Sequence, residues 1–230
     1  MIYITGDTHG SFYRVRDFCR SNNTTTDDVM VILGDAGINY WLDIRDEILK
    51  IRISELPITL LCIHGNHEAR PATIPTYMVK TFRCGVVYYE PEYPNILFAI
   101  DGQSYQLGNK RCLVIGGAYS VDKDIRIASD MPWFNDEQLD ERTKLHIANQ
   151  IKNDMNNQVD VIMSHTCPYK YVPTEMFLPS VDQSKVDTKM EKFLDEIEGI
   201  TEYTQWFCGH YHTNKTIDKI TFLYDDIVRL

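Results

Sequence analysis

The sequence lacks the features of disulfide-rich and membrane proteins. Its six cysteines contain no Cys-x-x-Cys pair, and several lie in apolar runs, which favours buried thiols in a reducing compartment. No apolar run approaches the length of a membrane span. The N-terminal residues show no basic segment followed by a long apolar one, so no signal peptide is visible. We therefore expect a cytoplasmic protein without a membrane partner.

Basic charge is also scarce. The chain has 23 Lys and Arg residues against 33 Asp and Glu residues, and its formal net charge is −10. Proteins that bind long nucleic acids are usually basic, so such a partner is disfavoured. A phosphorylated small molecule or a nucleotide is still compatible with this charge, because bound cations reverse the local field.

No internal repeat, low-complexity tract or linker interrupts the sequence. Its 230 residues are 43% hydrophobic and 24% charged, which is typical of a globular protein. A chain of this length buries roughly 70% of its unfolded surface and needs no disulfide or structural metal to fold. We expect a single domain over residues 1–230.

The first part of the chain alternates between two kinds of pattern. Short apolar runs at residues 2–5, 29–33 and 58–63 predict buried strands, and residues 11–21 and 41–55 have helical periodicity. Strands that alternate with helices in this way predict a parallel sheet with right-handed crossovers, as in α/β proteins.

The rest of the chain is expected to add a second sheet. Short β-rich segments within residues 77–116 predict an antiparallel meander in that sheet. Helices are expected at residues 135–156 and 185–197, strands at 159–163 and 205–208, and a terminal hairpin at 215–217 and 220–224. The predicted architecture has two sheets sandwiched between helices.

Metal-binding residue types follow five of the predicted strands, directly after a Gly or Ser at each strand end. The residues are Asp7 and His9, Asp35, Asn66 and His67, His165, and His210 and His212. In open α/β sheets the carboxyl ends of the strands line one crevice, so groups far apart in sequence meet there. We therefore expect one cluster of these side chains.

The chemistry of this cluster indicates divalent metal ions. Carboxylate, imidazole and amide groups suit Mn, and also Fe, Zn, Co or Ni, whereas the absence of cysteine ligands argues against a closed structural zinc site. Eight groups are too many for one ion with an open position, so we expect two ions with Asp35 as the shared ligand. A water held between the ions could attack phosphorus, while His67 could stabilise the transition state or protonate the leaving oxygen.

These motifs resemble the five signature blocks of the calcineurin-like metallophosphoesterases. They are Asp7-x-His9, Gly34-Asp35, Gly65-Asn66-His67-Glu68, His165 and Gly209-His210-x-His212, in the order found in the family. The resemblance implies a double β-sandwich flanked by helices. It also implies a phosphatase or phosphodiesterase that uses His67 as the catalytic histidine.

The resemblance implies two ligand sets as well. One ion would be held by Asp7, His9, Asp35 and His212, and the other by Asp35, Asn66, His165 and His210.

Several assignments stay open at this level. Arg70 and Arg126 are candidates to bind a substrate phosphate, with a surface ion pair as the alternative for Arg70. Glu68 either orients His67 or a ligand, or forms an ordinary salt bridge. Substrate choice between monoester and diester is undecided. A non-catalytic scaffold of the same fold, which binds metal and a partner, is the alternative to an enzyme.

Overall fold

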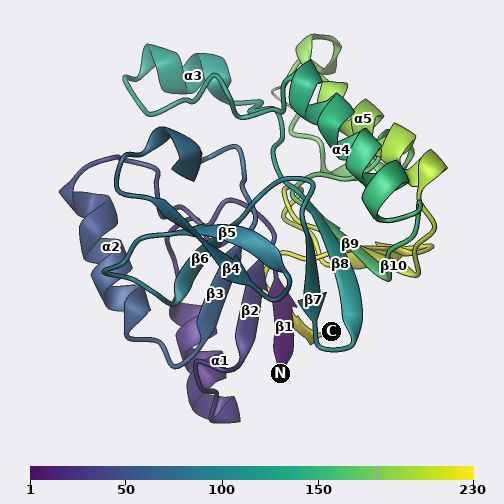
Figure 1. Cartoon of the computed structure of the whole chain (residues 1–230). Helices are drawn as coiled ribbons and strands as arrows, with labels where there is room; N and C mark the ends of the chain where they lie inside the picture. The colour runs from purple at the N-terminus through teal and green to yellow at the C-terminus, as the bar shows by residue number, and fades with distance from the viewer. Residues whose placement is uncertain (180) are drawn as a thin grey trace.

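The first sheet is built around three parallel strands at the start of the chain. The computed structural model describes residues 1–179 and 181–230. In it, β1 (Ile2–Thr5), β2 (Val29–Ile32) and β3 (Thr59–Cys62) lie side by side, joined by α1 (Tyr13–Asn22) and α2 (Ile44–Ser54) (Figure 1). All residues of these strands are buried, as expected of strands that are covered on both faces. The predicted βαβαβ unit is therefore confirmed.

Four further strands complete this sheet, which has seven strands in the order β13-β1-β2-β3-β6-β5-β4. They are β4 (Met78–Phe82), β5 (Gly85–Tyr89), β6 (Ile96–Ala99) and β13 (Ile227–Arg229). The strand β13 pairs antiparallel with β1 and has no counterpart among the sequence-based predictions.

The second sheet has six strands in the order β11-β12-β10-β9-β8-β7. Its members are β7 (Ser104–Leu107), β8 (Lys110–Ile115), β9 (Val161–Ser164), β10 (Gln205–Cys208), β11 (Lys215–Ile217) and β12 (Ile220–Phe222). The strands β8, β9, β10 and β12 are parallel to one another, and β11 and β12 form the predicted hairpin.

The expectation that residues 77–116 form one meander in the second sheet is wrong. The strands β4, β5 and β6 extend the first sheet, where β6 pairs parallel with β3, and only β7 and β8 belong to the second. All four residues of β6 are buried, because it lies inside the parallel core of the first sheet. Local composition identified the strands, but the choice of pairing partner depends on distant segments.

Three apolar clusters hold these layers together. The facing sheets share a core to which Val31 and Leu61 contribute from the first sheet, and Val114 and Phe207 from the second. Helices α1 and α2 cover the outer face of the first sheet. Helices α4 (Glu141–Asp154) and α5 (Lys189–Ile200) cover the outer face of the second (Figure 1). The sandwich of two sheets between helices is thus confirmed.

The connection between β8 and α4 differs from its prediction. The predicted helix at residues 135–156 begins only at Glu141, where the Asp140 carboxylate caps it by accepting from the Thr143 N–H over 2.7 Å. Before it, the short helix α3 (Lys123–Ala128) stands apart from both sheets (Figure 1). Short 3₁₀ turns lie at Pro71–Thr73, Tyr169–Tyr171, Thr174–Met176 and Gln183–Lys185.

Among the helices that the structure describes, none is long and apolar enough to cross a membrane. The single domain over residues 1–230 stays a prediction.

Candidate metal centre

The carboxyl ends of five strands bring the predicted residues together. Asp7 and His9 follow β1, Asp35 follows β2, and Asn66 and His67 follow β3, while the remaining histidines follow β9 and β10 of the second sheet. Glycine is required at two of these strand ends. A Cβ atom on Gly34 would lie 2.0 Å from His165 Nδ1, and one on Gly209 would lie 2.3 Å from Asp7 Oδ1.

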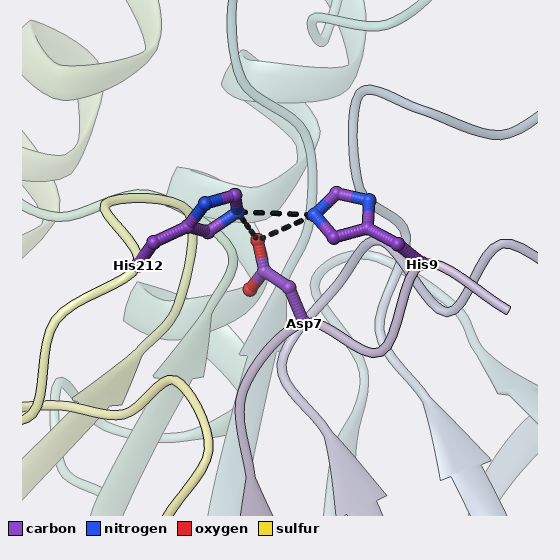
Figure 2. Close-up of side chains that lie close together, drawn as sticks. All are labelled: Asp7, His9 and His212. Carbon is purple, nitrogen blue, oxygen red and sulfur yellow. Dashed lines mark hydrogen bonds and ion pairs between the residues drawn. The ribbon is translucent and has the colours of Figure 1, made fainter. Parts of the chain in front are cut away.

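One group of side chains is open to solvent. The buried Asp7 Oδ2 lies 3.3 Å from His212 Nε2 and 3.8 Å from His9 Nε2, and the two Nε2 atoms lie 3.0 Å apart (Figure 2). Asp7 Oδ2 has no hydrogen-bond partner among the described residues. A buried carboxylate oxygen without a partner is costly, and a cation held among these three ligand atoms would satisfy it.

A second group is fully buried. Its members Asp7, Asp35 and His165 each place a ligand atom within 4.8 Å of the others. His165 Nδ1 lies 2.8 Å from the Leu33 carbonyl oxygen, which can only accept, so the Nδ1–H donates to it. The other nitrogen, Nε2, lies 3.6 Å from Asp35 Oδ1 and 2.8 Å from Asn66 Oδ1.

This arrangement calls for a positive charge between His165 and Asn66. In the neutral ring, Nε2 carries a lone pair that points at the Asn66 amide oxygen, which is also an acceptor. With the amide in this orientation, the two acceptors are compatible when a metal ion, or a proton on Nε2, lies between them. The donor set therefore fits a divalent cation.

His210 joins the buried group from the end of β10. Its ring centroid lies 4.9 Å from that of His165, and its backbone N–H donates to Asp7 Oδ1 over 3.0 Å. Burial lowers the pKa of His210 to about 3, so the ring is neutral and its lone pair is available to a metal.

Both carboxylates are ionised despite their burial. Burial by itself would raise the pKa of Asp7, but the neighbouring imidazoles of His212, His165 and His9 bring it below its usual value. Burial likewise opposes ionisation of Asp35, and the nearby His165, His67 and His9 lower its pKa. The site thus presents two anionic ligands at neutral pH.

Four of the predicted ligands have left-handed backbone conformations that are rare for residues other than glycine. The φ angles are 45° for His9, 45° for Asp35, 66° for His210 and 48° for His212. Such conformations cost of order 1–3 kcal/mol each and concentrate at functional sites. The strained backbone therefore directs these side chains at a cost in stability.

His67 lies at the edge of this centre, where its side chain is 26% exposed. Its backbone N–H donates to Asp35 Oδ1 over 2.8 Å, and its Nε2 atom lies 3.8 Å from Asp122 Oδ1. The ring stacks on Tyr40 at a centroid distance of 6.2 Å and an interplanar angle of 18°. Burial lowers the pKa of His67, although Asp35 and Asp122 oppose the shift.

Glu68 hydrogen-bonds to the backbone of the site, and among the described residues no hydrogen bond or ion pair joins it to the His67 side chain. Its carboxylate accepts from the backbone N–H groups of Gly65 and Gly37, at 3.0 Å and 3.2 Å. It is fully buried, and burial raises its pKa to about 8. Glu68 therefore ties the loop after β3 to the loop after β2.

The two arginines proposed for substrate binding have protein partners. Arg70 Nη1 pairs with Asp101 Oδ2 at 2.6 Å, and its Nε donates to the Asp136 carbonyl. Arg70 lines a cavity of about 620 Å³ whose lining includes none of the predicted metal ligands. Arg126 is only 2% exposed, and its Nε and Nη2 atoms donate to the Pro132 carbonyl. Their substrate roles remain predictions.

Other residues beside the centre were not identified from the sequence. Ser120 contacts Asn66, and Asp122 and Tyr40 lie beside His67. Ser120 and Asp122 lie five and seven residues beyond the end of β8, so the pattern of ligands directly after a strand does not reach them. The sequence signal was weak: β8 is followed by Gly116-Gly117, as the ligand strands are followed by Gly or Ser.

Comparisons with known proteins identify a family and a similar fold. A model of the calcineurin-like phosphoesterase family matches residues 1–214. Among solved structures, the crystal structure of TT1561 from Thermus thermophilus is similar, with a TM-score of 0.54 and 10% sequence identity. That match covers 97% of this chain and 87% of the other, and it supports the fold alone. No curated protein matches the sequence. The chain belongs to the calcineurin-like phosphoesterase family.

Proposed function

We propose that this protein hydrolyses a phosphate ester at a centre of two divalent cations. One ion would be held by Asp7, His9, Asp35 and His212, and the other by Asp35, Asn66, His165 and His210. The observation that carries the proposal is the partnerless Asp7 Oδ2, buried beside two imidazole nitrogens. The opposed acceptor atoms of Asn66 and His165 support it independently.

The chain's own residues prepare this chemistry. When bound, two divalent cations activate a water for attack on phosphorus and neutralise charge on the phosphate. Asp7 and Asp35 supply the anionic ligands, and the Leu33 carbonyl fixes the tautomer of His165 so that Nε2 faces the centre. His67, anchored through its backbone to Asp35, donates a hydrogen bond to the reacting phosphate or a proton to the leaving oxygen.

A phosphorylated small molecule or a nucleotide is the substrate class that we propose. The net charge of −10 disfavours long polyanions, which would need a basic surface. Mn is the cation we expect first, because the oxygen and nitrogen ligands suit it. We propose a cytoplasmic location on the reduced state expected for the buried cysteines.

The test compares bis-p-nitrophenyl phosphate with p-nitrophenyl phosphate, after chelation and after Mn²⁺ is added back. We expect chelation to abolish hydrolysis and Mn²⁺ to restore it, and the ratio of diester to monoester rates then directs the substrate search. Metal binding without cleavage of either ester, with any divalent ion, would contradict the proposal and favour a metal-binding scaffold.

A further inference from the structure

A chain of buried hydrogen bonds leads away from the ligand Asn66 into the connection between β8 and α4. Asn66 Nδ2 donates to Ser120 Oγ over 2.9 Å, and Ser120 Oγ donates to Glu137 Oε2 over 2.5 Å. Arg126 Nη1 also donates to Ser120 Oγ, over 3.0 Å. None of these four residues is more than 3% exposed. The polar groups of this network are therefore satisfied by protein partners rather than by bulk solvent.

The network leaves Ser120 only one way to contact Asn66. A hydroxyl group has one hydrogen and two lone pairs, and an arginine can only donate to it. Glu137 is an acceptor here, because the Ser120 N–H and Trp133 Nε1 also donate to its carboxylate, over 3.1 Å and 2.9 Å. The hydroxyl hydrogen is thus used by Glu137 and one lone pair by Arg126. The remaining lone pair must accept, so the NH₂ group of Asn66 faces Ser120.

The amide oxygen of Asn66 is thereby directed at His165. It lies 2.8 Å from His165 Nε2, whose lone pair is free because Nδ1–H donates to the Leu33 carbonyl. A flipped amide would donate its N–H to that lone pair instead. The flipped form is the better partner for a neutral imidazole, and it would block the nitrogen that a cation needs.

We propose that Ser120, held by Glu137 and Arg126, is a positioning residue that prevents Asn66 from flipping and capping His165. It keeps the buried half of the centre open for a cation. The inference rests on the proposed function in that it assumes cation binding at this centre. It also gives Arg126 a role. Its guanidinium donates to one lone pair of Ser120 Oγ and so keeps the hydroxyl group from reorienting.

Two substitutions test this role. Ser120→Ala removes the hydroxyl that holds the amide. Glu137→Gln is nearly isosteric, but its NH₂ group can donate to Ser120 Oγ, which frees the hydroxyl hydrogen for a flipped Asn66. The matched control is Ser129→Ala, an exposed serine of the same connection. Thermal melting of the chelated proteins establishes that each variant is folded.

The measurement is Mn²⁺ binding by isothermal titration calorimetry, with electron paramagnetic resonance to detect two coupled ions. We expect both variants to bind one of the two ions about 10–100-fold more weakly, the range typical for loss of an outer partner of a ligand. The other ion should bind as in the wild type, and the coupled signal should appear only at higher Mn²⁺ concentration. Ser129→Ala should match the wild type.

Three other outcomes can be distinguished: two would reject the inference about Ser120, and one would overturn the proposed function. Wild-type affinity for both ions in both variants would show that Ser120 does not position Asn66. Equal weakening of both ions, accompanied by a lower melting temperature of the chelated protein, would show a general structural role and also reject the inference. Failure of the wild type to bind two Mn²⁺ ions would overturn the proposed function itself.

Discussion

The two halves of the candidate centre differ in how firmly their side chains are held. In the open half, the side chains of His9 and His212 are 35% and 46% exposed, and their nitrogens contact only Asp7 and each other among the described residues. In the buried half, His165 is 0% exposed, and it is fixed by Leu33 and Asn66. Water can replace a lost ligand more readily in the open half than in the buried half, because His165 is shielded from solvent. The comparison indicates one permanently organised cation position and one that exchanges more easily.

The largest expected effect comes from removing the residue common to both halves. Asp35→Ala deletes the proposed shared ligand, so both ions should be lost and hydrolysis of bis-p-nitrophenyl phosphate abolished. Metal content by inductively coupled plasma mass spectrometry is the measurement. Asp17→Ala, an exposed carboxylate on α1, is the control and should keep both ions. Retention of two tightly bound ions in the Asp35 variant would reject the shared-ligand assignment.

Next in size is the effect of a side chain that binds neither ion. His67→Ala should lower turnover by roughly 10²- to 10⁴-fold, the range for general acid–base catalysis, while metal content stays near two ions. Steady-state kinetics and metal analysis on the same preparation separate the two properties. The control is His146→Ala, an exposed histidine on α4. Full activity in the His67 variant would show that the residue has no catalytic role.

The comparison between the halves is tested directly by removing one histidine from each. His165→Ala should weaken the binding of one Mn²⁺ ion by more than roughly 100-fold, because a ligand is lost from buried surroundings. His9→Ala should weaken the binding of one Mn²⁺ ion by less than roughly 100-fold. Calorimetric titration gives both affinities. Equal losses in the two variants would mean that burial does not distinguish the half-sites.

The smallest effect is expected far from both halves. Asp140→Ala removes the carboxylate that caps α4 and should lower the free energy of unfolding, because the Thr143 N–H loses its acceptor. For a chain of this size such a loss lowers the melting temperature by roughly 2–4 °C. Differential scanning calorimetry checks the shift, and Glu141→Ala on the same helix turn serves as a comparison. A change in Mn²⁺ affinity would show that the helix cap affects metal binding, and it would contradict the expectation that the cap affects stability alone.

Regions of the fold differ in how far the sequence predicts them. The strands β1 and β10 begin and end at the predicted residues, because each is a short and mostly apolar segment followed by glycine. The hairpin of β11 and β12 is equally local. In contrast, β13 is a short strand formed only by pairing with β1, at the opposite end of the chain. The division of β4 to β8 between two sheets is likewise a matter of long-range pairing.

The residues that gather at the candidate centre can be predicted from the chain alone, because each lies in the loop after a strand and parallel strands end at a common edge. The family follows from the chain too, through five motifs in order. Which oxygen or nitrogen atom each ligand presents depends instead on the folded molecule. The orientation of Asn66 is set by Ser120, Arg126 and Glu137, which lie 54 to 71 residues further along the chain. Hydrogen-bond direction is fixed by every partner at once, and those partners meet only when the chain has folded.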